Sequence, residues 1–316
     1  MHLKYVHGLK CKECSRNYPV IPQHVCEFCF GPLEVDYDLE GIGANIDRRT
    51  IADGPVSLWR YADFLPAPEG RIDLGAGFSR LTPAPRLAAE LGLKKLWLKN
   101  DGSNPTHSFK DRVVTVALSV ARSFGYRVAA CASTGNLAGA VAAHAAASGM
   151  QSVVMIPSGL ESGKIAAAAI YGAQAEGCSP VATAFESGSD EVRPVKPNTI
   201  ARSLAIGDPA DGYYAIEEAR VSGGRIASIP ESSVVDGIRL LAETEGIFTE
   251  TVGGVTIATL ERLVREGSIS AEEESVALIT GTGLKTLEAL GRPSVTHRIQ
   301  PSLESFERSL GKEVPA

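Results

Sequence analysis

A lysine at the expected start of a helix is the first candidate for chemistry in this sequence. The polar run from residue 100 to residue 112 leaves a predicted strand and places Lys110 in the first turn of the next helix. Because the N-terminal end of a helix is positive, an ammonium group there should lose its proton more easily than one on the surface. A neutral amine can form an imine with a carbonyl compound. The alternative is a solvated lysine before a surface pair, Asp111 and Arg112, and the residues alone favour it because most lysines are solvated.

A second polar loop precedes another predicted helix. Ser133, Thr134, Gly135 and Asn136 lie between a strand that ends at Ala132 and a helix rich in alanine. Hydroxyls, an amide and backbone N–H groups there converge on a helix N-terminus, which suits a carboxylate or a phosphate. An ordinary capped helix with a glycine turn explains the same residues equally well.

A glycine-rich turn follows a predicted buried strand near the C-terminus. The strand covers residues 275–279, and Thr280, Gly281, Thr282 and Gly283 follow it. Glycines there allow the backbone to approach a flat ligand closely. Alone, such a turn is weak evidence for a site.

Four cysteines near the N-terminus have the spacing of a metal site. Cys11, Cys14, Cys26 and Cys29 form a C-x2-C-x11-C-x2-C pattern, in which each pair puts two thiolates on one tight turn. Two facing turns supply the four ligands of a structural, tetrahedral Zn²⁺ site. The stretch between the pairs favours strands and turns, so the pattern predicts a zinc ribbon. The alternatives are disulfides, which are disfavoured without a secretory signal, and a ribbon without metal.

The elements that must position these loops alternate along the chain. Helices are predicted over residues 85–91, 108–124, 137–148 and 163–171, and strands over residues 95–99, 127–132 and 152–156. This alternation indicates an α/β fold with a parallel sheet and helices on both faces, in which ligands bind at the carboxyl ends of the strands. Residues 36–60 show no sustained period, and we expect a linker there.

Composition limits the class of protein. The 316 residues, 44% of them hydrophobic, predict a folded chain of about two globular units. A net charge of −6 argues against a nucleic-acid or membrane surface. The first residues contain no apolar run of a secretory signal, and no segment is apolar enough to span a membrane, so we expect a cytoplasmic protein.

In this order, the three loops resemble those of threonine synthases. The resemblance rests on residues 104–112, 133–136 and 280–283, and it extends to the cysteine-rich start and to residues 175–180, 196–201, 206–209 and 245–250. It implies the tryptophan-synthase-β-like fold (fold type II), pyridoxal phosphate as cofactor, and a lyase of threonine biosynthesis that converts O-phosphohomoserine and water to threonine and phosphate.

The resemblance also implies roles for individual residues. Lys110 would hold the cofactor through an imine, Asn136 would lie at its phenolic oxygen and Thr280 at its pyridine nitrogen, while Ser133 and Thr134 would face the substrate. A hydroxyl cannot neutralise a pyridinium charge as a carboxylate can. We therefore expect Lys110 to carry the proton transfers.

Two alternatives to threonine synthase remain. Cysteate synthases and serine/threonine dehydratases share the lysine and the Ser-Thr-Gly-Asn-type loop, although residues 175–180 and the ribbon favour threonine synthase. The other alternative is an inactive zinc-ribbon interaction protein, and the acidic charge argues against nucleic acid as its partner. The expected partner is the small-molecule substrate, and a homodimer remains open.

One segment that the resemblance implies is missing. After Ala173 the alternation predicts another buried strand, but residues 174–180 contain no apolar run. Family members continue here through two or three βα units, about a hundred residues. These units hold a Gly- and Asn-rich loop for the cofactor phosphate and an arginine segment for the substrate phosphate. We therefore predict an internal deletion at Gly172-Ala173.

The expected organisation has three parts. Residues 1–38 form the zinc-ribbon-like unit, residues 39–174 an α/β domain with the lysine and the substrate loop, and residues 175–316 the remainder of a second, incomplete α/β domain. Helices are predicted to open near Pro230 and Gly254 in this last part.

Overall fold

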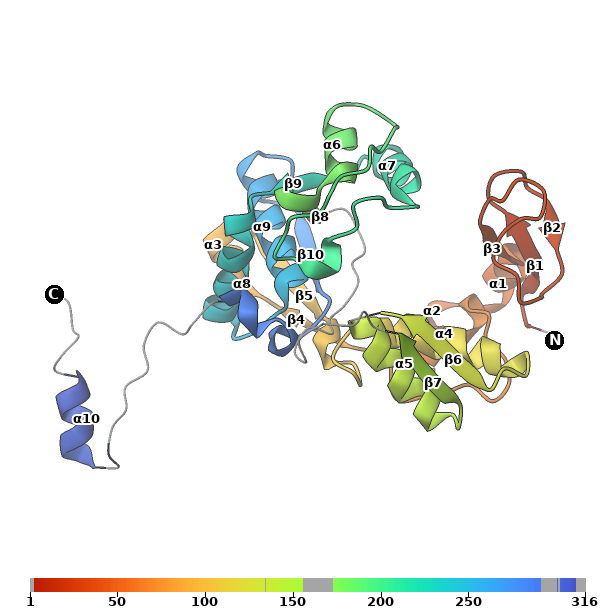
Figure 1. The fold of residues 1–316 in the computed structure, drawn as a ribbon, viewed down its shortest axis with the longest axis horizontal. Helices are drawn as coiled ribbons and strands as arrows, with labels where there is room; N and C mark the ends of the chain where they lie inside the picture. Colours follow the sequence, from red (N-terminus) through yellow and green to blue (C-terminus); the bar gives the residue numbers. More distant parts are fainter. Residues whose placement is uncertain (1–2, 134, 156–172, 291–299, 301, 311–316) are drawn as a thin grey trace.

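A computed structural model describes residues 3–133, 135–155, 173–290, 300 and 302–310 (Figure 1). The first unit is a small antiparallel sheet of strands β1 (Val6–Cys11), β2 (Asn17–Tyr18) and β3 (Leu33–Tyr37), in the order β2-β1-β3. The two cysteine pairs lie on the turns after β1 and before β3. The strand-and-turn character predicted between the pairs is confirmed.

The segment that follows contains short helices, so the prediction of a linker over residues 36–60 is wrong. Helix α1 covers Leu39–Asn45, α2 covers Arg48–Ala52, and a 3₁₀ helix, η1, covers Leu58–Phe64. Asp38 and Asp47 cap α1 and α2, because their side chains accept hydrogen bonds from backbone N–H groups of the first turn. Such capping stabilises helices too short to show a hydrophobic period.

A layer of helices and parallel strands follows the lysine loop. Helix α4 covers Lys110–Ser123, β6 Val128–Ala132, α5 Asn136–Ala147 and β7 Gln151–Met155. Strands β6 and β7 pair in parallel, and side chains of α4 and α5 pack beneath them in one apolar cluster. The predicted alternation is confirmed here. The helix predicted over residues 163–171 lies outside the described residues.

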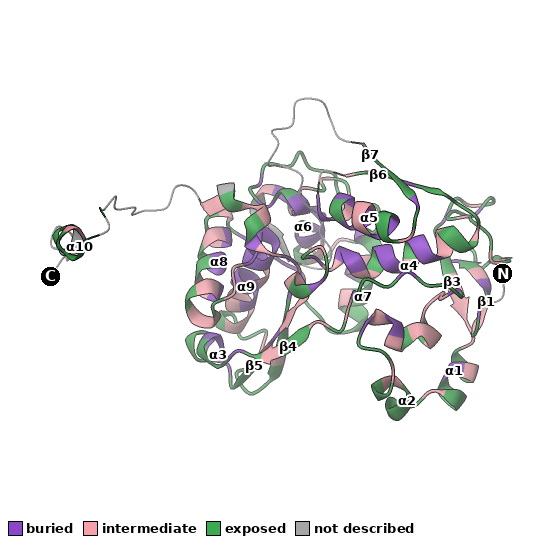
Figure 2. Cartoon of the chain, turned by 90° about the horizontal axis from the view of Figure 1, so that it is seen from below, coloured by how far each residue is buried: buried purple, intermediate pink, exposed green. Residues whose placement is uncertain are grey.

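A second layer joins segments that are far apart in the sequence. It contains β4 (Arg80–Pro83), α3 (Pro85–Leu91), β5 (Lys95–Asn100), α8 (Glu231–Glu245), α9 (Thr251–Arg265) and β10 (Glu274–Ile279). The sheet order is β10-β5-β4, with β10 parallel and β4 antiparallel to β5. Leu96 and Leu98 of β5 and Ile279 of β10 face the helices, and Figure 2 shows the buried residues gathered along α4, α8 and α9.

The other face of this sheet is largely open. Val276 and Leu278 of β10 are 52% and 54% exposed, and β10 is an edge strand among the described residues. The α/β class is confirmed, since parallel pairs and helices alternate as predicted. The strands, however, form separate small sheets, and this sheet carries its helices on one face.

Residues 173–230 form a smaller group of elements. These are β8 (Ala173–Ala175), η3 (Glu176–Cys178), α6 (Pro180–Glu186), η4 (Arg202–Leu204), α7 (Gly212–Val221) and β9 (Ala227–Ile229). Strand β8 pairs in parallel with β9, so a three-residue strand forms where the sequence shows no apolar run. Backbone hydrogen bonds to β9 explain it, because they do not require large apolar side chains.

The remaining short elements are η2 (Asp101–Ser103), η5 (Gly283–Lys285), η6 (Leu287–Leu290) and α10 (Leu303–Leu310). Helix α10 lies away from the other elements in both views (Figures 1 and 2). Within the described part of the chain, every helix is too short or too polar to cross a membrane.

Candidate functional site

The lysine loop and the glycine-rich turn lie against each other. Phe109 donates its backbone N–H to the carbonyl of Thr280 over 3.1 Å, and Ser108 forms a β-bridge with Gly281. These hydrogen bonds connect the start of α4 to the end of β10. Two of the three loops that the sequence selects are therefore adjacent in space.

Lys110 begins α4 and its side chain is buried, with 7% of the residue exposed. Burial lowers the pKa of Lys110 because it penalises the ammonium form, and the nearby Glu250 carboxylate opposes this shift. The Nζ atom lies 4.4 Å from the centroid of the Phe109 ring, and no described residue accepts a hydrogen bond from it. This direction agrees with the expected ease of deprotonation, and burial is the largest cause of the shift.

Asn136 and Thr280 meet at one buried carboxylate. Glu250 precedes α9, is 1% exposed, and accepts hydrogen bonds from Asn136 Nδ2 at 3.2 Å and from Thr280 Oγ1 at 3.4 Å. Burial raises the pKa of Glu250, and the hydrogen bond from Asn136 opposes that shift. Gly281 is required beside it, because a Cβ there would overlap the Glu250 carboxylate.

A second lysine enters the site from the same glycine-rich turn. Lys285 Nζ donates hydrogen bonds to Asn136 Oδ1 and to the carbonyl of Thr106, the latter over 2.7 Å. Burial lowers the pKa of Lys285, while the carboxylates of Glu250 and Asp111 oppose the shift. Unlike Lys110, this lysine has both an acceptor side chain and an acceptor carbonyl.

Asp111, the residue after Lys110, holds the lysine loop in place through buried hydrogen bonds. Asp111 and His144 are fully buried, and His144 Nε2 lies 3.0 Å from an Asp111 oxygen. Thr106 donates its backbone N–H and its hydroxyl to the same carboxylate, at 2.9 Å each. The surface pair of Asp111 with Arg112 is therefore not formed, and Arg112 pairs with Asp101 at 2.8 Å.

The predicted site residues have different outcomes. Asn136 and Thr280 hydrogen-bond to Glu250 and Lys110 lies near it, whereas Ser133 is half-buried at the start of α5 and accepts a hydrogen bond from the N–H of Gly135 at 3.2 Å. Thr134 lies outside the described residues. The roles of all five residues toward cofactor and substrate stay predictions.

Sequence reasoning missed Glu250 and Lys285 as site residues. Glu250 lies directly before α9, which begins at Thr251 and not at Gly254 as predicted. Lys285 lies two residues after the last glycine of the turn that the sequence selected. A polar side chain at the true start of an apolar helix, and a cation beside the glycine turn, were the signals available.

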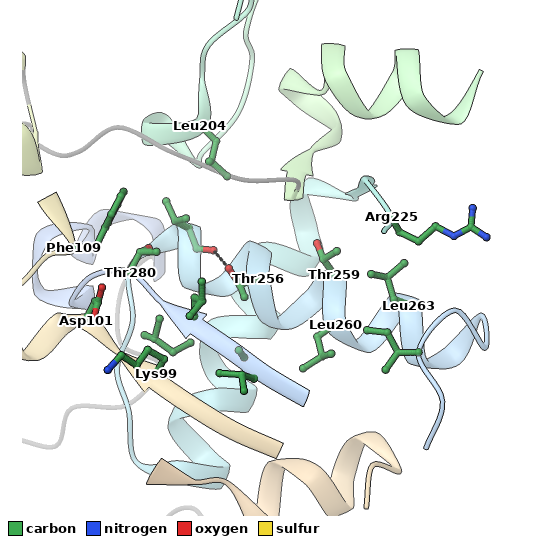
Figure 3. A pocket seen from close by; sticks show the side chains of 16 residues that line it. Lys99, Asp101, Phe109, Leu204, Arg225, Thr256, Thr259, Leu260, Leu263 and Thr280 are labelled. Carbon is green, nitrogen blue, oxygen red and sulfur yellow. Dashed lines mark hydrogen bonds between the residues drawn. The ribbon is translucent and has the colours of Figure 1, made fainter. Parts of the chain in front are cut away.

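A mostly apolar cavity of about 370 Å³ lies beside this cluster, between α9 and β10 (Figure 3). Phe109 and Thr280 line it together with Val252, Thr256 and Leu260 of α9. Lys110, Asn136 and Glu250 are not among its lining residues. The cavity therefore adjoins the polar cluster and is not its chemical centre.

The four cysteines of the first unit lie close together. All four Sγ atoms are within 4.8 Å of one another, with Cys11 and Cys29 3.4 Å apart and Cys14 and Cys26 3.7 Å apart. Thiolates each about 2.3 Å from a tetrahedral zinc would be about 3.8 Å apart. Backbone N–H groups of Cys14 and Phe28 also point at the sulfurs of Cys11 and Cys26. This arrangement is compatible with a structural zinc.

We expect the purified chain to carry about one zinc ion, held by these four thiolates. Elemental analysis of protein prepared under reducing conditions measures it, and thiol reagents should release the metal with loss of the ribbon only. The C11S substitution should remove the zinc, whereas the matched C131S substitution should retain it, because Cys131 lies on β6 outside the cysteine cluster. Protein free of metal under these conditions would contradict the assignment.

The sequence comparisons with known proteins agree with one another. The family model described as pyridoxal-phosphate dependent enzyme matches residues 72–175 and 167–281. The chain is 29% identical to a threonine synthase of Methanocaldococcus jannaschii, covering 90% of this chain and 94% of that protein. It is 30% identical to one of Halalkalibacterium halodurans, covering 73% and 91%.

Solved structures agree in fold. The processed form of threonine deaminase isoform 2 from Solanum lycopersicum superposes with a TM-score of 0.55 at 15% identity, covering 67% of this chain and 83% of that one. Maize serine racemase gives 0.53 at 14% identity, covering 74% and 93%. At such identities the likeness concerns the fold alone.

Two features of these matches bear on the missing segment. The alignment with the M. jannaschii protein runs over 383 positions, more than the 316 residues of this chain, so that relative has residues with no counterpart here. The two matched ranges of the family model overlap at residues 167–175, where the deletion is predicted.

The matches span more than half of the chain and include the lysine loop and the start of the glycine-rich turn. This chain belongs to the family of pyridoxal-phosphate dependent enzymes.

Proposed function

We propose that this chain is a lyase of the threonine synthase type, which converts O-phosphohomoserine and water to threonine and phosphate. The observation that carries the proposal is that Asn136 and Thr280 both donate hydrogen bonds to one buried carboxylate, Glu250, near the buried amine of Lys110. The choice of substrate is supported by relatives, since the threonine synthase of M. jannaschii aligns with 90% of this chain.

The residues present fit the cofactor of the family. Lys110 offers a buried amine without a hydrogen-bond acceptor among the described residues, Asn136 offers a second amide hydrogen, and Thr280 offers a hydroxyl oxygen on a neighbouring element. Lys110 would attach the cofactor, Asn136 Nδ2 would donate to its phenolic oxygen, and the Thr280 hydroxyl would meet its pyridine nitrogen. When bound, pyridoxal phosphate withdraws electrons from the substrate carbon next to the amino group.

The protein's own part in the reaction is proton transfer and orientation. Lys110 Nζ, whose pKa is lowered by burial, would accept a proton as the base and return it afterwards. Thr280 hydrogen-bonds to Glu250, so the pyridine nitrogen would face a hydroxyl with a carboxylate behind it. The loop at Ser133 and the N-terminus of α5 provide N–H groups that suit a departing phosphate.

The alternatives predict other products. A serine/threonine dehydratase would form a 2-oxoacid and ammonia from serine or threonine, and a cysteate synthase would form cysteate. An inactive zinc-ribbon interaction protein would release nothing. Alignment with threonine synthases over 90% of the chain favours the first assignment over these.

The test compares these substrates on the same preparation supplied with pyridoxal phosphate. We expect phosphate and threonine from O-phosphohomoserine at a rate above that of the K110A variant, and no 2-oxoacid from serine or threonine above that control. The same panel is measured on a chain with the missing segment restored, where rates should be higher. Formation of 2-oxoacid without phosphate would assign the dehydratase activity instead. If neither chain forms a product, the inactive zinc-ribbon interaction protein becomes the favoured assignment.

A further inference from the structure

The side-chain amide of Asn136 is held between two charged groups. Its Oδ1 accepts a hydrogen bond from Lys285 Nζ, and its Nδ2 donates to Glu250 Oε2 at 3.2 Å. An ammonium group can only donate and an ionised carboxylate can only accept. The two contacts therefore determine which end of the amide faces which side, and Asn136 itself is 2% exposed, so water does not compete strongly.

Lys285 is itself fixed in position. Its second hydrogen bond, 2.7 Å long, goes to the carbonyl of Thr106 in the loop that leads to Lys110. Thr106 is in turn bound to Asp111, which His144 contacts from α5. The ammonium group thus connects the glycine-rich turn, the lysine loop and the start of α5.

We propose that Lys285 is a positioning residue of the cofactor site, whose ammonium group orients Asn136 so that Nδ2 faces the phenolic oxygen of pyridoxal phosphate. An amide NH₂ has two hydrogens, so Nδ2 can serve Glu250 and the cofactor together. With the amide reversed, Oδ1 would face both the carboxylate and the phenolic oxygen, and acceptors without a donor are costly when buried. This inference rests on the family's cofactor and not on the choice of substrate.

The orientation should change the cofactor's acid–base behaviour. A hydrogen bond donated to the phenolic oxygen stabilises its negative charge, so the imine next to it gives up its proton more easily. Without Lys285 the amide loses its fixed orientation and this bond weakens. The pH at which the visible band of the bound cofactor changes should then rise.

The experiment is a double-mutant cycle on the full chain with millimolar pyridoxal phosphate. The variants are K285M, N136A, the double variant, K285R, and K94M as a matched control at a lysine that pairs with Glu272 on the surface. The two readouts are the pH midpoint of the visible band and the cofactor dissociation constant. Circular dichroism confirms that each variant is folded.

We expect K285M to raise the midpoint by about one pH unit and to weaken cofactor binding about tenfold, because a hydrogen bond of a charged group is lost. N136A should behave similarly, and K285M should add little in the N136A background. K285R, which retains a cationic donor, should recover part of both effects, and K94M should match the wild type.

Three results would overturn the inference. K285M could match the wild type, or its effect could persist undiminished in the N136A background, which would indicate a direct action of the charge on the cofactor. The wild type could also show no visible band, which would remove the cofactor site and the inference together. A normal band without threonine formation would leave the inference intact and contradict only the proposed substrate.

Discussion

Borohydride reduction of the chain in the presence of pyridoxal phosphate is expected to fix the pyridoxyl group on Lys110. Its amine is buried, its pKa is lowered by that burial, and no described residue accepts a hydrogen bond from Nζ. Burial lowers the pKa of Lys285 as well, but its Nζ donates to Asn136 and Thr106 and is not free. Peptide mapping by mass spectrometry identifies the labelled lysine.

The labelling has an expected pH dependence. At a pH near or below about 10.4, the ordinary pKa of an exposed lysine, a lysine with a lowered pKa has the larger neutral fraction. Label on Lys110 should therefore decline less than label on exposed lysines as the pH falls from about 10 to about 7. The K110A and K110R variants should lose the specific label entirely, and K94A should keep it.

Two results would contradict this assignment. Label on Lys285 with Lys110 unmodified would move the cofactor to the other lysine. If the ratio of label on Lys110 to label on exposed lysines stayed constant with pH, burial would not lower the pKa of the Lys110 amine.

The alternation of strands and helices could be predicted because each element has its own periodic spacing of apolar residues. The helix predicted over residues 85–91 is α3, Pro85–Leu91. The helix after the lysine loop begins two residues later and ends one residue earlier than predicted, and the next strand begins one residue later and ends at Ala132 as predicted. In these segments apolar residues recur at the spacing of the element, and that spacing holds whatever packs against it. The short helices α1 and α2 have no such period and were missed.

The composition of the site could be predicted only in part, since its geometry is tertiary. Lys110, Asn136 and Thr280 could be selected because each lies in a loop of unusual composition after a predicted strand. Glu250 joins them through the packing of α9 against β10, a contact that no local pattern encodes. Lys285 can be recognised as a site residue only from its hydrogen bond to the Asn136 amide, a contact that the sequence does not show.

The second large effect that we expect concerns the missing segment. The deletion is supported by the alignment over 383 positions and by the two separate family matches, which overlap at residues 167–175. The structure shows what surrounds such a gap: β6 and β7 form a sheet of two strands, and β10 is an edge strand with Val276 and Leu278 half-exposed beside an apolar cavity. Strands of parallel sheets are normally covered on both faces.

Loss of the loop for the cofactor phosphate should be measurable without any turnover. If the loop that the resemblance implies is missing, several charge-assisted hydrogen bonds to a dianion are lost, each worth about 1.5–3 kcal/mol, and the affinity for pyridoxal phosphate should fall by several powers of ten. Pyridoxal, which has no phosphate, loses nothing. We therefore expect the two compounds to bind this chain within about tenfold of each other, as measured by the visible band on Lys110.

Restoring the segment should recover both cofactor preference and activity. The variant inserts the corresponding residues of the M. jannaschii threonine synthase between residues 172 and 173, and a Gly/Ser linker of equal length is the control. The restored chain should prefer pyridoxal phosphate over pyridoxal by several powers of ten and should release phosphate from O-phosphohomoserine faster than the unmodified chain, whereas the linker control should behave like the unmodified chain in both respects. Because the inserted segment should cover the open face of β10, the restored chain should also have a higher melting temperature than the unmodified chain.

The unmodified chain is expected to release phosphate far more slowly than the roughly 1 s⁻¹ of an ordinary enzyme. O-phosphohomoserine, the proposed substrate, carries a phosphate of its own, and the arginine segment that the resemblance implies for it is predicted to be missing. Lys110 can supply the imine and the proton transfer, but it cannot hold two phosphates in place. Turnover near 1 s⁻¹ by the 316-residue chain, with a strong preference for pyridoxal phosphate over pyridoxal, would show that another part of this chain binds the phosphates.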